Sequence, residues 1–352
     1  MTERKWKKQE EELVRMASKS IGKVSAMRRS RFIGAENIFS RPLRICGKLY
    51  QTLKNETAYR DAPVEGVSVT AKYFDNVQLL SKKPRSTLLM LHGAPGSHRD
   101  FEPLINRLTE RNHRIIAPDF PGLELSRVTK YMYRHSPEEK SDFTKELLKQ
   151  VGIDEIDMLI SHSSGSFIAA NLASGSYPRI KSLGLMNPVG YELIPQMKPY
   201  ILWRSLFVLL SSGYENLVLK IVQAAMKMKS NPFSVQDLEG AIEGGIAQMN
   251  VDREKVKEQM LRIRESSLPI LYVYSENDRV MTRSLNKNLI RHLGKDESNA
   301  DVYDKNGRLV SLVSSDGSPE LIQFSNGGHF TFKKSPEIVA EAIVNFVEKK
   351  LK

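Results

Sequence analysis

Residues 159–167 read Leu159-Ile160-Ser161-His162-Ser163-Ser164-Gly165-Ser166-Phe167, and within this stretch an apolar strand pattern changes into the start of a helix. Ser163 stands at the apex of the turn between the two patterns. A serine hydroxyl is a weak nucleophile by itself, so this position has chemical meaning only if a histidine base and a carboxylate are available. The chain supplies candidates for both after residue 163.

The candidate base is His329, which follows the last strand pattern in the sequence Gly327-Gly328-His329. The two glycines give the loop the backbone freedom to turn an imidazole inward. We therefore predict that His329 takes the proton of Ser163.

The candidate orienting acid is Asp278, a few residues after the strand pattern at 268–274. A carboxylate in this place holds the imidazole in one tautomer and stabilises its charged form. Glu276 is the local alternative, and we prefer Asp278 because it lies further beyond the end of the strand.

A third requirement is a pair of donors for the negative oxygen of a tetrahedral intermediate. The main-chain amide of Ser164, at the start of the predicted helix, is one candidate. The other is the amide of Ala94 in the loop Leu91-His92-Gly93-Ala94-Pro95-Gly96-Ser97, where His92 is expected to be structural.

Strand and helix patterns alternate from Gly66 onward, which is typical of a mainly parallel sheet covered by helices. Between Tyr191 and Ser267 the strand signal stops and four helical patterns follow one another. We divide the chain into a basic helical extension (1–60), a first core part (61–190), a helical insertion (191–267) and a second core part (268–352). A hairpin is predicted over 302–310, turned at Asn306-Gly307.

With these motifs and with Ala117-Pro118-Asp119-Phe120-Pro121-Gly122, the chain resembles the α/β-hydrolase superfamily in its AB hydrolase-1 form. The resemblance implies an α/β-hydrolase fold: an eight-stranded, mostly parallel sheet flanked by helices, with the insertion 191–267 as a lid. Two positions depart from the usual pattern. Ser161 replaces the first glycine of the nucleophile turn, and Glu124 stands where a glycine is common.

The residue type at the nucleophile position limits the reactions that the chain could catalyse. Related epoxide hydrolases and dehalogenases use an apex aspartate, so Ser163 favours acyl transfer to water. We expect a serine hydrolase that cleaves an ester or lipid-like acyl substrate through an acyl-enzyme, without metal or cofactor. Thioesterase, amidase and carbon–carbon bond hydrolase activities remain open, as does a non-catalytic binding protein of the same fold.

The insertion is rich in apolar residues at helical spacing, which line a pocket for an acyl chain or hold the insertion to the core. From this pattern we predict Trp203, Phe207 and Met226 as substrate contacts.

Charge and cysteine content bear on partners and compartment. The formal net charge is +12, and much of the excess lies in a predicted helix over 4–31. That helix is expected to pack on the core or to lie on a membrane surface; a mitochondrial presequence is disfavoured by Glu10, Glu11 and Glu12. No nucleic-acid-binding motif accompanies the charge.

The single cysteine, Cys46, excludes an intrachain disulfide and favours the cytoplasm, with membrane association as the alternative.

Overall fold

The computed structural model describes residues 37–352 except 57–58, 124, 127–130, 132, 229–237, 315–317 and 351–352. The predicted helix over 4–31 and Glu124 lie outside the described residues.

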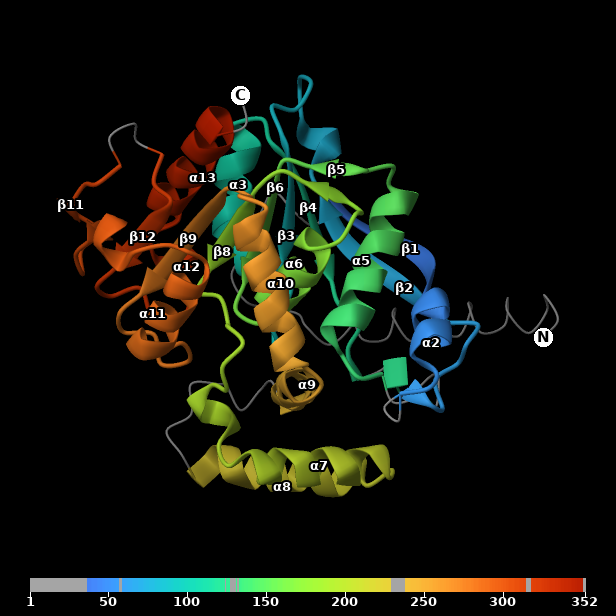
Figure 1. Ribbon diagram of the computed structural model, residues 1–352. Coiled ribbons are helices and arrows are strands. Elements are labelled where there is room, and N and C mark those ends of the chain that lie inside the picture. The colour runs from blue at the N-terminus through green and yellow to red at the C-terminus, as the bar shows by residue number, and fades with distance from the viewer. Residues whose placement is uncertain are drawn as a thin grey trace, which may run out of the picture. The chain divides into compact units, whose positions relative to one another are not determined.

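The core is one sheet of ten strands in the order β1-β2-β4-β3-β6-β8-β9-β12-β10-β11 (Figure 1). The strands are β1 (Ile38–Ile45), β2 (Val67–Asp75), β3 (Thr87–Leu91), β4 (Arg114–Asp119), β6 (Met158–His162), β8 (Leu183–Met186), β9 (Ile270–Ser275), β10 (Asp301–Tyr303), β11 (Leu309–Ser311) and β12 (Leu321–Phe324). Every pairing from β4 through β10 is parallel, whereas β1, β2 and β11 are antiparallel to their neighbours. A separate parallel pair joins β5 (Glu155–Ile156) to β7 (Arg179–Ile180).

Helices cover both faces of the sheet. The helices are α2 (Gly47–Leu53), α3 (Glu102–Glu110), α5 (Pro137–Gln150), α6 (Gly165–Ala173), α7 (Tyr200–Ser211), α8 (Glu215–Met228), α9 (Leu238–Met249), α10 (Arg253–Glu265), α11 (Arg283–His292), α12 (Thr331–Lys334) and α13 (Pro336–Lys350), with short 3-10 turns η3 (Val77–Leu79), η4 (His98–Phe101), η5 (Pro195–Met197) and η6 (Glu297–Asn299). Apolar residues of α5, α6, α10 and α11 share one core cluster with the sheet. Helices α3 and α13 pack together on the opposite face (Figure 1).

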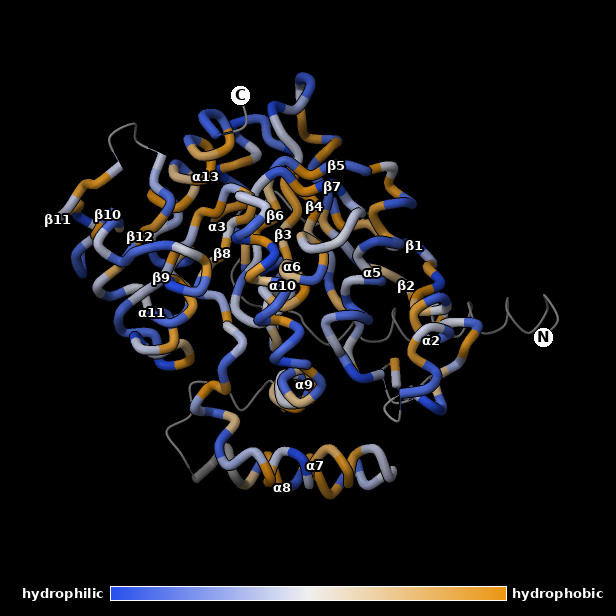
Figure 2. The backbone as a smooth tube through the Cα atoms, in the orientation of Figure 1, coloured by the Kyte–Doolittle hydropathy of each residue, from blue (hydrophilic) through white to orange (hydrophobic). Residues whose placement is uncertain are grey.

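The central strands are apolar on both sides because helices cover both faces of the sheet. All five residues of β6 are buried, as are four of the five in β3. Figure 2 shows this hydrophobic centre at β3, β4 and β6. Because these strands are parallel, their carboxyl ends lie at one edge of the sheet, and the loops that follow them lie close together.

The predicted α/β-hydrolase fold is confirmed, but the sheet has ten strands instead of eight. The two additional strands are β10 and β11, which form the hairpin predicted around Asn306-Gly307. The hairpin extends the sheet because β10 also pairs in parallel with β12.

The predicted helical extension over 1–60 is wrong for its last part. Ile38–Ile45 forms β1 and pairs with β2 over its whole length, so the compact unit that contains the sheet begins at Asn37. Only Leu43 and Ile45 are buried in this edge strand, and Pro42, Arg41 and Arg44 interrupt the apolar alternation. Charged residues and proline are common on edge strands, where one side of the backbone has no partner strand.

The insertion between β8 and β9 contains η5 and the helices α7 to α10, and its described residues include no strand. Helix α10 packs on α6 and so belongs to the layer that covers the sheet. Helices α7, α8 and α9 enclose a small apolar core of their own, which includes Leu206, Val218 and Ile242. None of the described helices combines the length and apolar character that a membrane span requires.

A buried carboxyl group joins α5 to α2. Glu139 accepts hydrogen bonds from the Tyr50 hydroxyl (2.8 Å) and from the main-chain amides of Arg134 (3.0 Å) and Ser136 (3.2 Å). Burial raises the pKa of Glu139 from its ordinary value of 4.5 to about 7. The folded chain therefore keeps this proton at pH values where the unfolded chain has released it.

This difference predicts a pH dependence of stability. The free energy of unfolding should decrease as the pH rises from about 4.5 to about 7, because the folded state binds more protons than the unfolded state over that range, and the dependence should level off above it. Glu139→Gln removes the titrating group and should flatten the curve. Urea unfolding of both proteins at several pH values measures this; parallel curves would contradict the assignment.

Candidate active site

Ser163 occupies a two-residue turn between β6, which ends at His162, and α6, which begins at Gly165. Its φ angle is 51°, in the left-handed region that residues with a side chain rarely adopt. Strained residues of this kind persist where the surrounding structure holds them, and they gather at functional sites. Here the turn carries the serine hydroxyl beyond the carboxyl edge of the sheet.

Glycine is required at two positions that lie next to the turn in space, Gly165 and Gly93. A Cβ atom on Gly165 would lie 2.6 Å from the carbonyl oxygen of Leu91 and 2.8 Å from that of His92. A Cβ atom on Gly93 would lie 2.8 Å from Cβ of Ser163. The start of α6 therefore packs directly against the end of β3.

Ser161, which replaces the first glycine of the usual pattern, lies inside β6. It pairs with Leu91 of β3 and Leu185 of β8, and it is fully buried. Its side chain fits without a left-handed backbone, but its hydroxyl has no hydrogen-bond partner among the described residues. Serine in place of glycine at position 161 thus introduces an unpaired polar atom, and the tight turn between β6 and α6 still forms.

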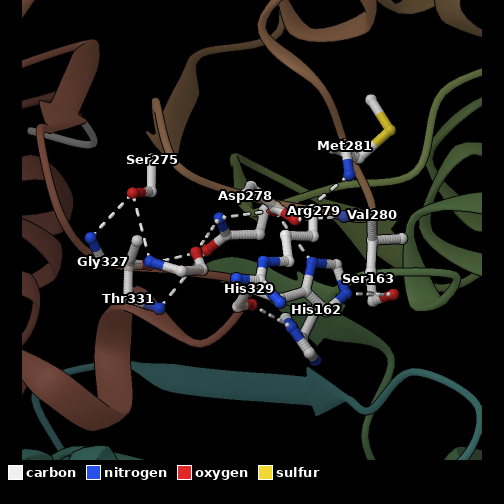
Figure 3. A network of polar contacts seen from close by, with 12 residues as sticks. His162, Ser163, Ser275, Asp278, Arg279, Val280, Met281, Gly327, His329 and Thr331 are labelled. Atoms are coloured by element: carbon white, nitrogen blue, oxygen red, sulfur yellow. Dashed lines mark hydrogen bonds and ion pairs between the residues drawn. The ribbon is translucent and has the colours of Figure 1, made fainter. Parts of the chain in front are cut away.

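The structure brings together the three residues predicted as nucleophile, base and acid (Figure 3). Ser163 Oγ lies 2.8 Å from His329 Nε2, and His329 Nδ1 lies 2.8 Å from Asp278 Oδ2. The other carboxylate oxygen, Asp278 Oδ1, accepts from the amides of Val280 (2.8 Å) and Met281 (3.1 Å). A hydrogen-bonded chain therefore runs from a buried carboxylate through the imidazole to the serine hydroxyl.

Glu276, the alternative acid, points elsewhere. Its carboxylate forms an ion pair with Arg283 at 3.5 Å, and its side chain is 31% exposed, whereas the side chain of Asp278 is fully buried. The geometry thus favours Asp278 as the partner of His329.

Of the two predicted oxyanion donors, Ser164 belongs to the turn and Ala94 lies in the loop after β3. The amide of Ala94 donates to the side-chain hydroxyl of Ser164 at 2.9 Å. The amide of Ser164 lies at the N-terminus of α6, where main-chain N–H groups have no partner within the helix. A substrate oxygen bound to Ala94 would take the place of the Ser164 hydroxyl.

His92 is held in one tautomer by main-chain groups. Its Nδ1–H donates to the Gly93 carbonyl at 2.6 Å, and its Nε2 accepts from the Phe120 amide at 3.1 Å. Burial lowers the pKa of His92. Both ring nitrogens are occupied, which fits the predicted structural role.

Sequence reasoning did not identify three polar residues that hold the base in place. His162 Nε2–H donates to the carbonyl oxygen of His329 at 2.8 Å, and burial, followed by the charge of His329, lowers the pKa of His162 well below its usual value. Ser275 Oγ accepts from the amides of Gly327 (2.7 Å) and Gly328 (3.2 Å). The third residue is Asn187, which bonds to Asp278.

One signal in the sequence could have found two of these residues. Asn187 immediately follows the buried strand β8, and Ser275 is the last residue of β9. Polar residues at the carboxyl ends of buried parallel strands lie at the edge of the sheet where ligands and active sites are found.

A cavity of about 770 Å³ opens beside Ser163 and His329. Its lining also includes the loop residues Gly93 to Ser97, apolar side chains of Val189, Ile194, Met197, Trp203, Val280 and Phe330, and polar side chains of Asp100, Gln196, Glu239, Glu243 and Gln248. Helix α9 forms part of one wall, where a Cβ atom on Gly244 would lie 3.0 Å from the carbonyl oxygen of Ala94. The insertion therefore borders both the cavity and the Ala94 loop.

The three predicted substrate contacts have different positions. Trp203 of α7 lines the cavity. Phe207 does not: it lies one turn further along α7, where it packs with residues of α8 and α9, and the Arg134 guanidinium lies 5.6 Å from its ring centre. The side chain of Met226 lies outside the described part of the structure.

Within the described residues, no group of three or more His, Cys, Asp or Glu side chains is arranged to hold a metal ion.

Comparisons with known proteins agree with this fold. A family model described as "Alpha/beta hydrolase of unknown function (DUF1057)" matches residues 46–348. The uncharacterized protein F35H12.5 of Caenorhabditis elegans is 27% identical over 113 residues, which are 31% of this chain and 30% of that protein. This chain therefore aligns with less than a third of the length of that relative.

Solved structures extend the likeness to most of the chain. A thermophilic esterase from Thermogutta terrifontis is 13% identical, with a TM-score of 0.56 over 89% of this chain and 100% of its own. The haloalkane dehalogenase DbeA from Bradyrhizobium elkani is 14% identical, with a TM-score of 0.55 over 89% of this chain and 99% of its own. At such low identity the likeness establishes the fold, which supports more than one reaction.

Alanine should have opposite effects at the two small residues that flank the turn, Ser161 in β6 and Gly165 at the start of α6. Gly165→Ala should destabilise the protein strongly, by more than about 3 kcal/mol, because its Cβ would contact two carbonyl oxygens of β3 and the following residue. Ser161→Ala should keep or raise the stability, since it removes a buried hydroxyl without a partner, a defect that typically costs about 1–3 kcal/mol. Thermal unfolding measures both. Gly175→Ala, near the end of α6, is the control for adding a methyl group. The opposite order of stabilities would contradict this description of the turn.

Proposed function

We propose that this chain, which belongs to the DUF1057 family of α/β-hydrolases, is a serine hydrolase that transfers the acyl group of an ester to water. The observation that carries the proposal is the hydrogen-bonded chain from Asp278 through His329 to Ser163, at the wall of a large cavity. Nucleophile and base lie within hydrogen-bond reach, and the base is oriented by a buried carboxylate, as this chemistry requires.

In the proposed first half-reaction, Ser163 Oγ attacks the carbonyl carbon of the ester while His329 Nε2 takes the hydroxyl proton. The amides of Ala94 and Ser164 donate to the oxygen that becomes negative. When the tetrahedral intermediate collapses, His329 gives the proton to the leaving alkoxide, and an acyl ester of Ser163 remains. Asp278 stabilises the imidazolium that forms between these two transfers.

In the second half-reaction, a water molecule replaces the departed alcohol. His329 takes one proton of this water, and the oxygen attacks the acyl carbon. Collapse of the second intermediate returns the proton to Ser163 and releases the carboxylic acid. The same residues thus act twice.

The identity of the nucleophile separates this proposal from dehalogenation, the activity named for DbeA. A carboxylate nucleophile that displaces halide forms an ester, which water can then cleave. A serine that displaced halide would form an ether, which has no carbonyl carbon for water to attack. The serine at position 163 therefore supports acyl transfer.

The proposed substrate carries an apolar acyl group. Part of the cavity wall is apolar and consists of Val189, Ile194, Met197, Trp203 and Val280. Each methylene of an acyl chain that is buried against this wall would contribute about 0.8 kcal/mol to binding. We assign the insertion 191–267 the role of a lid because α7 and α9 line the cavity. Thioesters and amides enter the same reaction with a different leaving group.

For the N-terminal segment we keep the proposal of a contact with a membrane surface, based on its basic residues between 4 and 31. A cytoplasmic location is likewise a proposal that rests on the single cysteine.

The nucleophile assignment predicts a loss of covalent labelling. The wild-type protein should react with a fluorophosphonate probe, and mass spectrometry should locate the adduct on Ser163. Ser163→Ala should abolish labelling, whereas Ser161→Ala, two residues away, should retain it. A folded wild-type protein that binds ligands without reacting would favour the alternative, a non-catalytic binding protein of this fold.

The apolar wall predicts a change in chain-length preference. In a series of acyl p-nitrophenyl esters, kcat/KM of the wild type should rise by up to about fourfold per methylene until the cavity is filled. Trp203→Ala should reduce kcat/KM for long acyl chains and leave acetate nearly unchanged. The matched control is Leu202→Ala, because the adjacent Leu202 is 49% exposed. Equal effects on all chain lengths would place the acyl group elsewhere.

A further inference from the structure

Asn187 is a fully buried polar residue at the carboxyl end of β8, between the strands that carry Ser163 and Asp278. Its φ angle is 44°, and asparagine tolerates this left-handed conformation better than most residues with a side chain. Its main-chain N–H donates to the Val273 carbonyl of β9 at 2.7 Å. The residue is therefore fixed by the sheet before its side chain makes any contact.

The side-chain amide of Asn187 joins the acid to the loop of the base. Its Nδ2 donates to Asp278 Oδ2 at 3.1 Å and to the Gly328 carbonyl oxygen at 3.1 Å. Its Oδ1 accepts from the Thr331 hydroxyl at 2.7 Å and from the Thr331 amide at 3.4 Å. An amide has two donor hydrogens and an acceptor oxygen with two lone pairs, and all of them are used here.

We propose that Asn187 is a positioning residue that fixes Asp278 relative to His329. Asp278 Oδ2 accepts from both Asn187 Nδ2 and His329 Nδ1, and the Gly328 carbonyl belongs to the residue just before His329. One amide group thus sets the position of the carboxylate and of the chain that carries the imidazole. This inference rests on the proposed function, in which His329 must stay aligned through two proton transfers.

The donor half of the amide is the part that this role requires. Asn187→Leu would lose both the donor contacts and the acceptor contacts of the amide. Aspartate would keep the acceptor for Thr331 but would place a second carboxylate against Asp278 and the Gly328 carbonyl, where no hydrogen is available. Thr331→Val is the complementary change, because it removes the hydroxyl that bonds Asn187 Oδ1 and leaves both donor contacts in place.

Asn187 does not belong to the cavity lining, so it should act on the rate of reaction and leave substrate binding alone. The His329 side chain also contacts the Ser163 hydroxyl and the rings of His162 and Phe330. None of these three residues shares a hydrogen bond with the side chain of Asn187, whose described partners are Asp278, Gly328 and Thr331, so substitutions at 187 remove none of their contacts with His329.

The test compares Asn187→Leu, Asn187→Asp and Thr331→Val with the wild type, each checked for folding by thermal unfolding. The first measurement is kcat and KM for p-nitrophenyl butyrate, normalised to the number of sites that react with the fluorophosphonate. The second is the proton NMR resonance of His329 Nδ1–H, which a short bond to a carboxylate moves far downfield. This resonance is assigned by its absence in His329→Gln.

We expect kcat of both Asn187 variants to fall by about 10²-fold with little change in KM, as for a reacting group displaced by about 1 Å. Their downfield resonance should shift or disappear. Thr331→Val should keep kcat within about threefold and keep the resonance, although its loss of a buried hydrogen bond lowers stability.

Folded Asn187 variants that keep kcat and the resonance would overturn the inference, as would a Thr331→Val variant that loses as much kcat as they do. A wild-type protein without esterase activity would instead refute the proposed function. In that case the NMR comparison still decides whether Asn187 holds Asp278 against His329.

Discussion

Ser163 leaves β6 in a left-handed conformation, and α6 begins so close to the end of β3 that a Cβ atom on Gly165 would lie 2.6 Å from the carbonyl oxygen of Leu91. This close approach fixes the turn around which the rest of the site lies. Because the neighbouring strands are parallel, β8 and β9 end at the same edge as β6, and the loop after β12 closes over them. Asn187, Asp278 and His329 therefore come from distant parts of the sequence and meet beside one hydroxyl.

Burial makes this polar cluster sensitive to its partners. The side chain of Asp278 is fully buried, and its carboxylate accepts from the amides of Val280 and Met281, from Asn187 and from His329. A buried carboxylate with several donors stays oriented, whereas one without them would lose much of its stabilisation on leaving water. His162 adds a neutral ring against His329, since burial lowers its pKa. In the proposed reaction, His329 would gain its charge in surroundings that are already arranged for it.

The sequence was sufficient to predict the fold, and the three residues predicted as nucleophile, base and acid lie within hydrogen-bond distance of one another in the structure. Both predictions depend on local patterns. The turn around Ser163, the glycines before His329 and the strand before Asp278 each have a recognisable composition. Residues defined by contacts between distant segments were harder to find. The role of Asn187 depends on the adjacency of β8 and β9, which the sequence does not show. Phe207 packs with α8 and α9 and does not line the cavity, a position that could not be predicted because helical spacing does not say which face of a helix meets a cavity. Strand β1 was missed since Arg41, Pro42 and Arg44 hide its alternation.

The central claim is that Ser163 carries the acyl group between two half-reactions, and direct detection of that intermediate tests it best. The protein is mixed with a p-nitrophenyl ester, quenched with acid within the first turnover and weighed by mass spectrometry. The account predicts a gain equal to the acyl group, located on the peptide that contains Ser163, together with a burst of p-nitrophenol. Hydrolysis of the ester without an acylated Ser163, or with the acyl group on another residue, would contradict it.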